Sequence, residues 1–89
     1  MMNWFYETIG LSERNLQWLN GFNKIRENED LIEFRVTPLM RINRVLIERN
    51  GETFNLTFFR KGFPILYRKD VKGENMQDTL EAMTGVSFG

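Results

Sequence analysis

The chain has 89 residues, of which 42% are hydrophobic and 13% aromatic, and its formal net charge is zero. This length predicts a single domain spanning residues 1–89, and the supply of large apolar side chains argues against disorder. The sequence contains no cysteine and no histidine. Their absence excludes disulfides and Cys–His or Ser–His nucleophilic catalysis, and it removes the usual ligands of zinc, haem, copper and iron–sulfur sites.

Targeting and catalytic signals are also missing. No apolar run approaches the roughly 20 residues of a membrane span, and the N-terminus has neither the basic nor the apolar region of a signal peptide. The catalytic residue types that remain are carboxylates, tyrosine and lysine, and no motif arranges them. We therefore expect a cytoplasmic, non-enzymatic protein without a metal or cofactor.

The first elements are helical by pattern. Residues 2–9 form either a short helix or an extended arm that ends at Gly10. Ser12 is a good N-cap, with Leu11 and Leu16 at the positions of a hydrophobic staple. Apolar residues then recur at three-residue spacing, which predicts a helix over roughly 12–26. The spaced residues are Leu16, Leu19, Phe22 and Ile25. Asn20-Gly21 is an alternative end for this helix.

Strand patterns follow. Ile32, Phe34 and Val36 alternate with polar residues, as in a half-buried strand. Asn50-Gly51 is a strong hairpin signal, and a two-residue turn there places Ile47 opposite Phe54. A second turn at Lys61-Gly62 places Phe58 opposite Ile65.

These two turns divide the side chains of the meander between two faces. The predicted core face holds Val45, Ile47, Phe54, Leu56, Phe58, Ile65 and Tyr67. The predicted outer face holds Arg44, Leu46, Glu48, Thr53, Asn55, Thr57, Leu66 and Arg68, and Ile42 and Phe59 are assigned to the same side. The outer face is mostly polar and should meet water or a partner.

The last element is a helix over residues 74–84, because Met76, Leu80 and Met83 make one apolar stripe. Gly85 fits the C′ position that ends a helix. The chain is therefore predicted to be an α+β two-layer sandwich. Its antiparallel four-stranded β-meander carries an N-terminal and a C-terminal helix on one face.

Basic residues concentrate in the middle of the chain. Residues 35–72 hold nine basic and three acidic residues, whereas residues 1–34 and 73–89 are net acidic. Charged strand surfaces alone account for such a pattern, since they protect sheet edges. Mixed with apolar side chains, however, arginines also suit an interface. The candidate partner-binding residues are Arg44, Leu46, Asn55, Thr57, Phe59, Leu66 and Arg68.

Two functions remain open at this stage. A protein partner fits the mixture of arginine and apolar residues, and self-association as a homo-oligomer is one form of it. A nucleic acid fits the basic residues, although only Phe59 is placed to stack on a base. Trp4, Phe5 and Tyr6 make a second candidate patch or belong to the core. In size, in its absence of cofactor residues and in its lack of motifs, the chain resembles the small inhibitors and regulators that phages and mobile elements encode.

Overall fold

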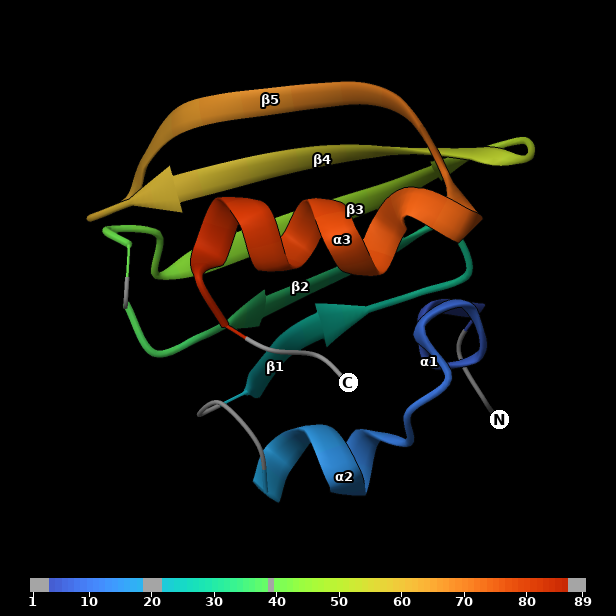
Figure 1. Cartoon of the computed structure of the whole chain (residues 1–89), viewed down its shortest axis with the longest axis horizontal. Coiled ribbons are helices and arrows are strands. Elements are labelled where there is room, and N and C mark those ends of the chain that lie inside the picture. Colours follow the sequence, from blue (N-terminus) through green and yellow to red (C-terminus); the bar gives the residue numbers. More distant parts are fainter. Residues whose placement is uncertain (1–3, 19–21, 39, 87–89) are drawn as a thin grey trace.

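The computed structural model describes residues 4–18, 22–38 and 40–86, which form three helices and one antiparallel sheet. In chain order the elements are α1 (Trp4–Ile9), α2 (Glu13–Trp18), β1 (Asn23–Glu27), β2 (Leu31–Arg35), β3 (Arg44–Asn50), β4 (Thr53–Arg60), β5 (Phe63–Lys72) and α3 (Gly73–Thr84). The five strands lie in the sheet in the order β1-β2-β3-β4-β5. Figure 1 shows α3 lying across one face of this sheet. The α+β class and the meander are confirmed, with one strand more than predicted.

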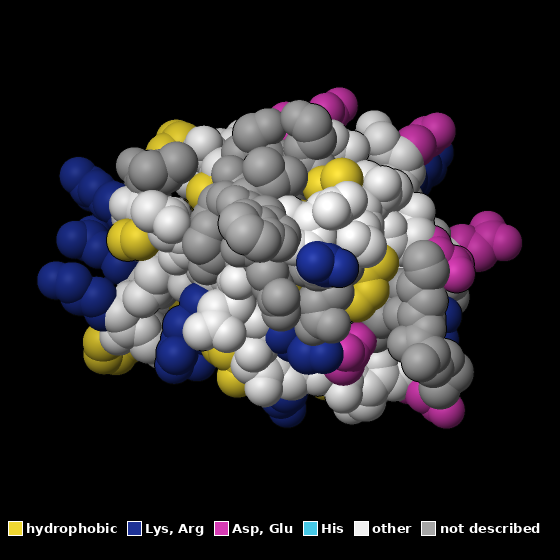
Figure 2. Space-filling model, turned by 90° about the horizontal axis from the view of Figure 1, so that it is seen from below, with side chains coloured by type: hydrophobic (Ala, Val, Ile, Leu, Met, Phe, Trp, Pro, Cys, Tyr) yellow, Lys and Arg dark blue, Asp and Glu magenta, His cyan; other side chains and the backbone are white. Residues whose placement is uncertain are grey.

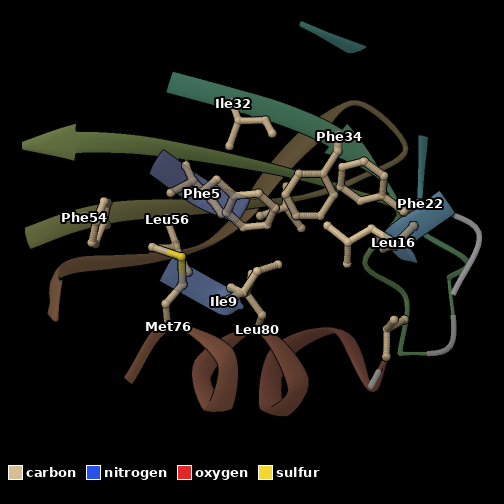
Figure 3. Packing of buried hydrophobic residues seen from close by; sticks show 14 of the residues in the cluster. Phe5, Ile9, Leu16, Phe22, Ile32, Phe34, Phe54, Leu56, Met76 and Leu80 are labelled. Carbon is tan, nitrogen blue, oxygen red and sulfur yellow. The ribbon is translucent and has the colours of Figure 1, made fainter. Parts of the chain in front are cut away.

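The core lies between the sheet and the helices (Figure 3). Phe5 lies on α1, Phe22 lies in the segment before β1, and Phe34 lies on β2. Their ring centroids are 4.8–6.5 Å apart. Met76 and Leu80 of α3 are fully buried in the same cluster. Five residues of the predicted core face are buried as expected: Val45, Ile47, Phe54, Leu56 and Phe58.

The extra strand is β1, which occupies the second half of the predicted helix 12–26. Helix α2 ends at Trp18, and Leu19, Asn20 and Gly21 lie outside the described residues. The helix predicted from the three-residue spacing is wrong in this half, where Ile25 is an exposed residue of the strand instead of facing the core. Strand β1 pairs with β2 across a turn in which the side chain of Asn28 accepts hydrogen bonds from the backbone amides of Asp30 and Leu31. Sheet pairing has therefore overridden the local helical pattern.

The β3–β4 hairpin keeps the predicted faces but not the predicted register. Ile47 pairs with Leu56 instead of Phe54, which is a shift of two residues. The loop consists of Gly51 and Glu52, and of the turn residues only Gly51 has a positive φ, at 65°. That φ pattern is the one of a type II′ turn, which places glycine first, and not of a type I′ turn at Asn50-Gly51. A shift of two residues leaves each side chain on its face because the strand period is two.

Helix α3, at Gly73–Thr84, agrees with the predicted helix 74–84 to within one residue. Residues 4–9 are helical, so the helix alternative for residues 2–9 is correct for the part that is described. The Oγ of Ser12 accepts a hydrogen bond from the amide of Asn15 at 3.2 Å, as an N-cap does. Gly85 ends α3 with φ 73°.

The N-terminal aromatic residues belong to the core. Phe5 and Tyr6 are buried, and Trp4 stacks on Phe54 with ring centroids 5.1 Å apart. The indole N–H of Trp4 also donates to the carbonyl of Glu29 at 2.8 Å. This patch is therefore committed to packing α1 against the sheet.

Candidate functional site

The candidate site lies on the outer face, which we define as the side of the sheet turned away from α3. Cross-strand pairs place residues of β2, β3, β4 and β5 in rows on this face. One row is Arg35, Arg44, Phe59 and Pro64, and the next is Glu33, Leu46, Thr57 and Tyr67. Five candidate residues are on this face and partly exposed, as the sequence predicted: Arg44, Leu46, Asn55, Thr57 and Phe59.

The predicted positions of Leu66 and Arg68 on this face are wrong. The β4–β5 turn is at Lys61-Gly62 as expected, with positive φ at both residues, and Phe59 pairs with Pro64. The ladder then shifts by one residue between Phe59 and Phe58, so that Phe58 pairs with Leu66. Such a bulge exchanges the faces of the side chains that follow it. Leu66 and Arg68 therefore lie on the α3 side, and Tyr67 takes their place beside Thr57.

The predicted burial of Ile65 and Tyr67 is wrong for a second reason. Strand β5 is the last strand of the sheet, and its residues from Phe63 to Asp70 are all exposed. The burial of Ile42 is the opposite case, since this residue was assigned to the outer face and is in the core. It belongs to the β2–β3 connection, for which the sequence offered no register.

Exposed apolar side chains concentrate on β5. Phe63 is 71% exposed, Ile65 45%, Leu66 38% and Tyr67 52%. A shallow hollow is lined by Thr57 of β4 and by Pro64, Ile65, Leu66 and Tyr67 of β5. Contiguous exposed apolar surface of this kind marks interaction sites in monomeric proteins. We refer to Pro64, Ile65, Leu66 and Tyr67 as the β5 patch.

Arg44 is held in place beside this patch. Its guanidinium carbon lies 4.1 Å from the centroid of the Phe59 ring, and its Nε lies 3.3 Å from Oε2 of Glu33. The other carboxylate oxygen of Glu33 accepts a hydrogen bond from Nε of Arg26 at 2.8 Å. Glu33 is only 7% exposed, so its carboxylate is largely shielded from water. The sequence did not reveal this ion-pair group, because Arg26 was assigned to a helix.

Asn55 is committed to holding β5. Its Oδ1 accepts a hydrogen bond from the amide of Asp70 at 3.0 Å, and Asp70 has φ 58°. The ladder shifts again beside this contact, between the pairs made by Phe54 and Leu56. Asn55 therefore shapes the second bulge of β5, a role that the sequence pattern did not predict.

Charge is segregated along the strands. Residues 35–47 and 53–69 contain no acidic residue. Because the strands are antiparallel, Arg35, Arg44 and Arg60 come together at the end of the sheet where Lys61 makes the β4–β5 turn. Figure 2 shows Asp and Glu side chains mostly toward one end of the molecule, while Lys and Arg side chains project from the opposite end and also lie across the middle. The basic end adjoins the β5 patch.

The described ranges contain neither a metal-binding cluster nor a membrane-spanning helix. No group of three or more acidic side chains among these residues is placed to hold a metal ion. None of the described helices is long and apolar enough to span a membrane.

Comparison of the chain with protein-family models, with curated proteins and with solved structures gave no significant match. The site is therefore interpreted from its own residues. They offer an apolar strand, a fixed arginine and a basic end, which together can bind a partner with apolar and acidic groups.

Proposed function

We propose that the chain is a non-enzymatic binding protein that docks a protein partner through the β5 patch and the adjoining outer face. The observation that carries this proposal is the run of exposed large apolar side chains on a strand at the edge of the sheet. Phe59 pairs with Pro64 of the patch and Arg44 lies over the Phe59 ring, and arginine and aromatic residues are enriched where proteins bind one another.

The mode of action that fits such a surface is regulation or inhibition of the partner by occupying its surface. The chain brings no cysteine or histidine for chemistry of its own. Its fold needs no disulfide, which suits the reducing cytoplasm. We propose that the chain belongs with the small inhibitors and regulators of phages and mobile elements, which it resembles in size and in its lack of motifs.

A nucleic-acid-binding module is the second candidate. The bulge in β5 favours it, because it brings Tyr67 to the outer face beside Thr57 and adds an exposed aromatic ring to Phe59. Bases stack on such rings, and Arg35 and Arg60 could contact phosphates. The contact of Arg44 with the ring of Phe59 argues against it, since this arginine occupies a face that a base would need.

Self-association through β5 is less consistent with its residues. Two copies paired edge to edge would each bring the basic residues Arg68 and Lys69 to the shared edge, which adds like charges there. Pro64 has no amide hydrogen to donate across such an edge, and two bulges distort the strand. We therefore propose a different protein as the partner.

The proposal is tested by capture from a lysate of the native host with three immobilised forms of the chain, each with and without nuclease. The forms are the wild type, the Ile65→Ser/Tyr67→Ser double variant, and Ile25→Ser as a control. Ile25 is also an exposed apolar residue, but it lies on β1 at the opposite edge of the sheet.

We expect one protein to be retained after nuclease treatment by the wild type and by Ile25→Ser, and to be lost from the β5 double variant. Loss of the protein on nuclease treatment would favour the nucleic-acid candidate. Equal capture by all three forms would place the binding surface elsewhere. Thermal unfolding of each form confirms that the losses do not arise from misfolding.

A further inference from the structure

Arg44 has the features of an arginine prepared to bind an anion. The ring of Phe59 lies 4.1 Å from its guanidinium carbon, and Oε2 of Glu33 lies 3.3 Å from its Nε without forming a hydrogen bond. Its side chain is 29% exposed, and among the described residues the acidic group that it contacts is Glu33. An arginine whose plane is already fixed loses less entropy when it forms a bidentate pair with a carboxylate or phosphate.

Arg35 adds a second positive charge at the same place. It is directly opposite Arg44 in the β2–β3 ladder, so the two side chains start about 5 Å apart on the same face. Like charges directly opposite each other destabilise a sheet unless an opposite charge compensates them. Glu33 offsets part of the charge, but it is shared between Arg44 and Arg26. An anion bound by Arg35 and Arg44 would remove the remaining repulsion.

The β5 patch limits what can carry this anion. The row Arg35–Arg44–Phe59–Pro64 runs across the strands from the arginine pair to the patch. Neighbouring strands are about 4.8 Å apart, so Arg44 on β3 and the patch on β5 are about 10 Å apart. A partner that uses both sites presents an anionic group and an apolar group at that separation.

We propose that Arg44 and Arg35 bind a carboxylate from an acidic segment of the protein partner, whose apolar side chains occupy the β5 patch. The proposal rests on the function proposed above and names the chemistry of the partner. Three observations favour a protein segment over a nucleic acid strand. The ring of Phe59 is already occupied by Arg44. Arg35 and Arg44 lie at one end of the sheet, and the exposed Glu48 lies further along the outer face, where a chain of phosphates would have to pass.

The test is an NMR titration of the isotope-labelled chain with short synthetic ligands. The first is a peptide that alternates glutamate with leucine, and the second is the same peptide with glutamine in place of glutamate. Inorganic phosphate and a short single-stranded oligonucleotide are the third and fourth. We expect the glutamate peptide to shift the Nε–Hε signals of Arg35 and Arg44 and the backbone amide signals of the β5 patch residues that carry an N–H, and the glutamine peptide to bind more weakly.

A matched pair of variants identifies the residue. Arg44→Lys keeps the charge but loses the planar fork, and we expect it to weaken glutamate-peptide binding about tenfold, the factor for one charge-assisted hydrogen bond. Arg49→Lys is the control. Arg49 also lies over an aromatic ring, that of Trp4 at 5.8 Å, and also pairs with a carboxylate, that of Asp30 at 3.5 Å. It lies at the other end of β3, and its replacement should leave the affinity unchanged.

Three results would overturn the inference. The glutamate peptide could leave the Arg35 and Arg44 signals unshifted up to millimolar concentration, the glutamine peptide could bind equally well, or the oligonucleotide or free phosphate could bind more tightly than the peptide. These results are distinguishable from failure of the proposed function. If an immobilised Arg44→Lys chain still captures the partner through β5, protein binding stands and the carboxylate site is wrong.

Discussion

At the scale of single residues, Glu33 has an unusual place. Among the residues whose burial the structure describes, it is the only buried charged residue. Its carboxylate binds Arg26 and Arg44, which are themselves partly exposed. Removing a shielded carboxylate leaves its two cationic partners without a counter-charge, which costs more than breaking an exposed ion pair.

Replacement of Glu33 should therefore destabilise the fold. We expect Glu33→Ala to lower the free energy of unfolding by about 1–3 kcal/mol, since two arginines lose a shared partner. Glu27→Ala is the control, because Glu27 pairs with Lys24 in a more exposed pair that should contribute at most about 1 kcal/mol. Urea unfolding measures both variants. Equal losses of unfolding free energy in the two variants would show that the burial of Glu33 adds nothing to stability.

Phe58 and Phe63 allow a comparison of buried and exposed phenylalanines. Phe58 is fully buried, and Phe58→Ala should cost about 3–5 kcal/mol through lost contacts and a cavity. Phe63→Ala should change stability by no more than about 0.5 kcal/mol, because the ring is mostly exposed. A loss below about 1 kcal/mol for Phe58→Ala in urea unfolding would mean that the core face is assigned incorrectly.

At the scale of elements, the hairpin turns decide the registers. Gly51 has φ 65°, and a Cβ placed there would have nothing within 4 Å, so its requirement for glycine is purely conformational. Lys61 and Gly62 both have positive φ, which is the pattern of a type I′ turn. The two turns therefore differ in type, although each looked like a two-residue hairpin loop in the sequence.

Substitutions in the first turn test this assignment. Gly51→Ala should cost about 1–2 kcal/mol, because an L-residue is strained at positive φ. Asn50→Ala should cost no more than about 0.5 kcal/mol, because Asn50 is the exposed last residue of β3 and has no positive φ. Thermal unfolding compares the two variants. A cost for Asn50→Ala as large as that for Gly51→Ala would instead support a type I′ turn at Asn50-Gly51.

How far the sequence predicts each element depends on whether its signal is local. The positions of β2, β4 and α3 follow from the period of their apolar residues. The predicted faces of β3 and β4 are also correct, because the predicted register is wrong by two residues and two residues is the period of a strand. The outer-face positions of Arg44 and Phe59 were predictable for the same reason. Strand β1 and the bulge at Ile65 were not predictable from the sequence, because both depend on pairing between strands. A single extra residue then exchanged Leu66 for Tyr67 on the outer face.

At the scale of the whole molecule, the two edges of the sheet differ. Strand β1 is short and largely polar, with Ile25 as its exposed large apolar residue. Strand β5 carries an apolar patch, and basic residues lie at the turn before it and at Arg68 and Lys69 within it. The molecule thus presents one edge that suits a partner with acidic and apolar groups.

The same features predict the state of the free chain. We expect a monomer at micromolar concentration by sedimentation velocity, because charge, Pro64 and the bulges oppose pairing of two β5 edges. The Arg68→Thr/Lys69→Thr double variant removes the charge and should associate measurably. A stable dimer of the wild type would contradict the choice of a different protein as the partner.

The most direct test of the binding surface is hydrogen exchange of the chain alone and in complex with the protein that it captures. The account predicts slower amide exchange in the complex for residues 61–70, which cover the β4–β5 turn and most of β5. It predicts no change for residues 23–30, which form β1 and its turn at the opposite edge. Slower exchange confined to residues 23–30 or to α1 and α3, with 61–70 unchanged, would contradict the claim that β5 is the docking surface.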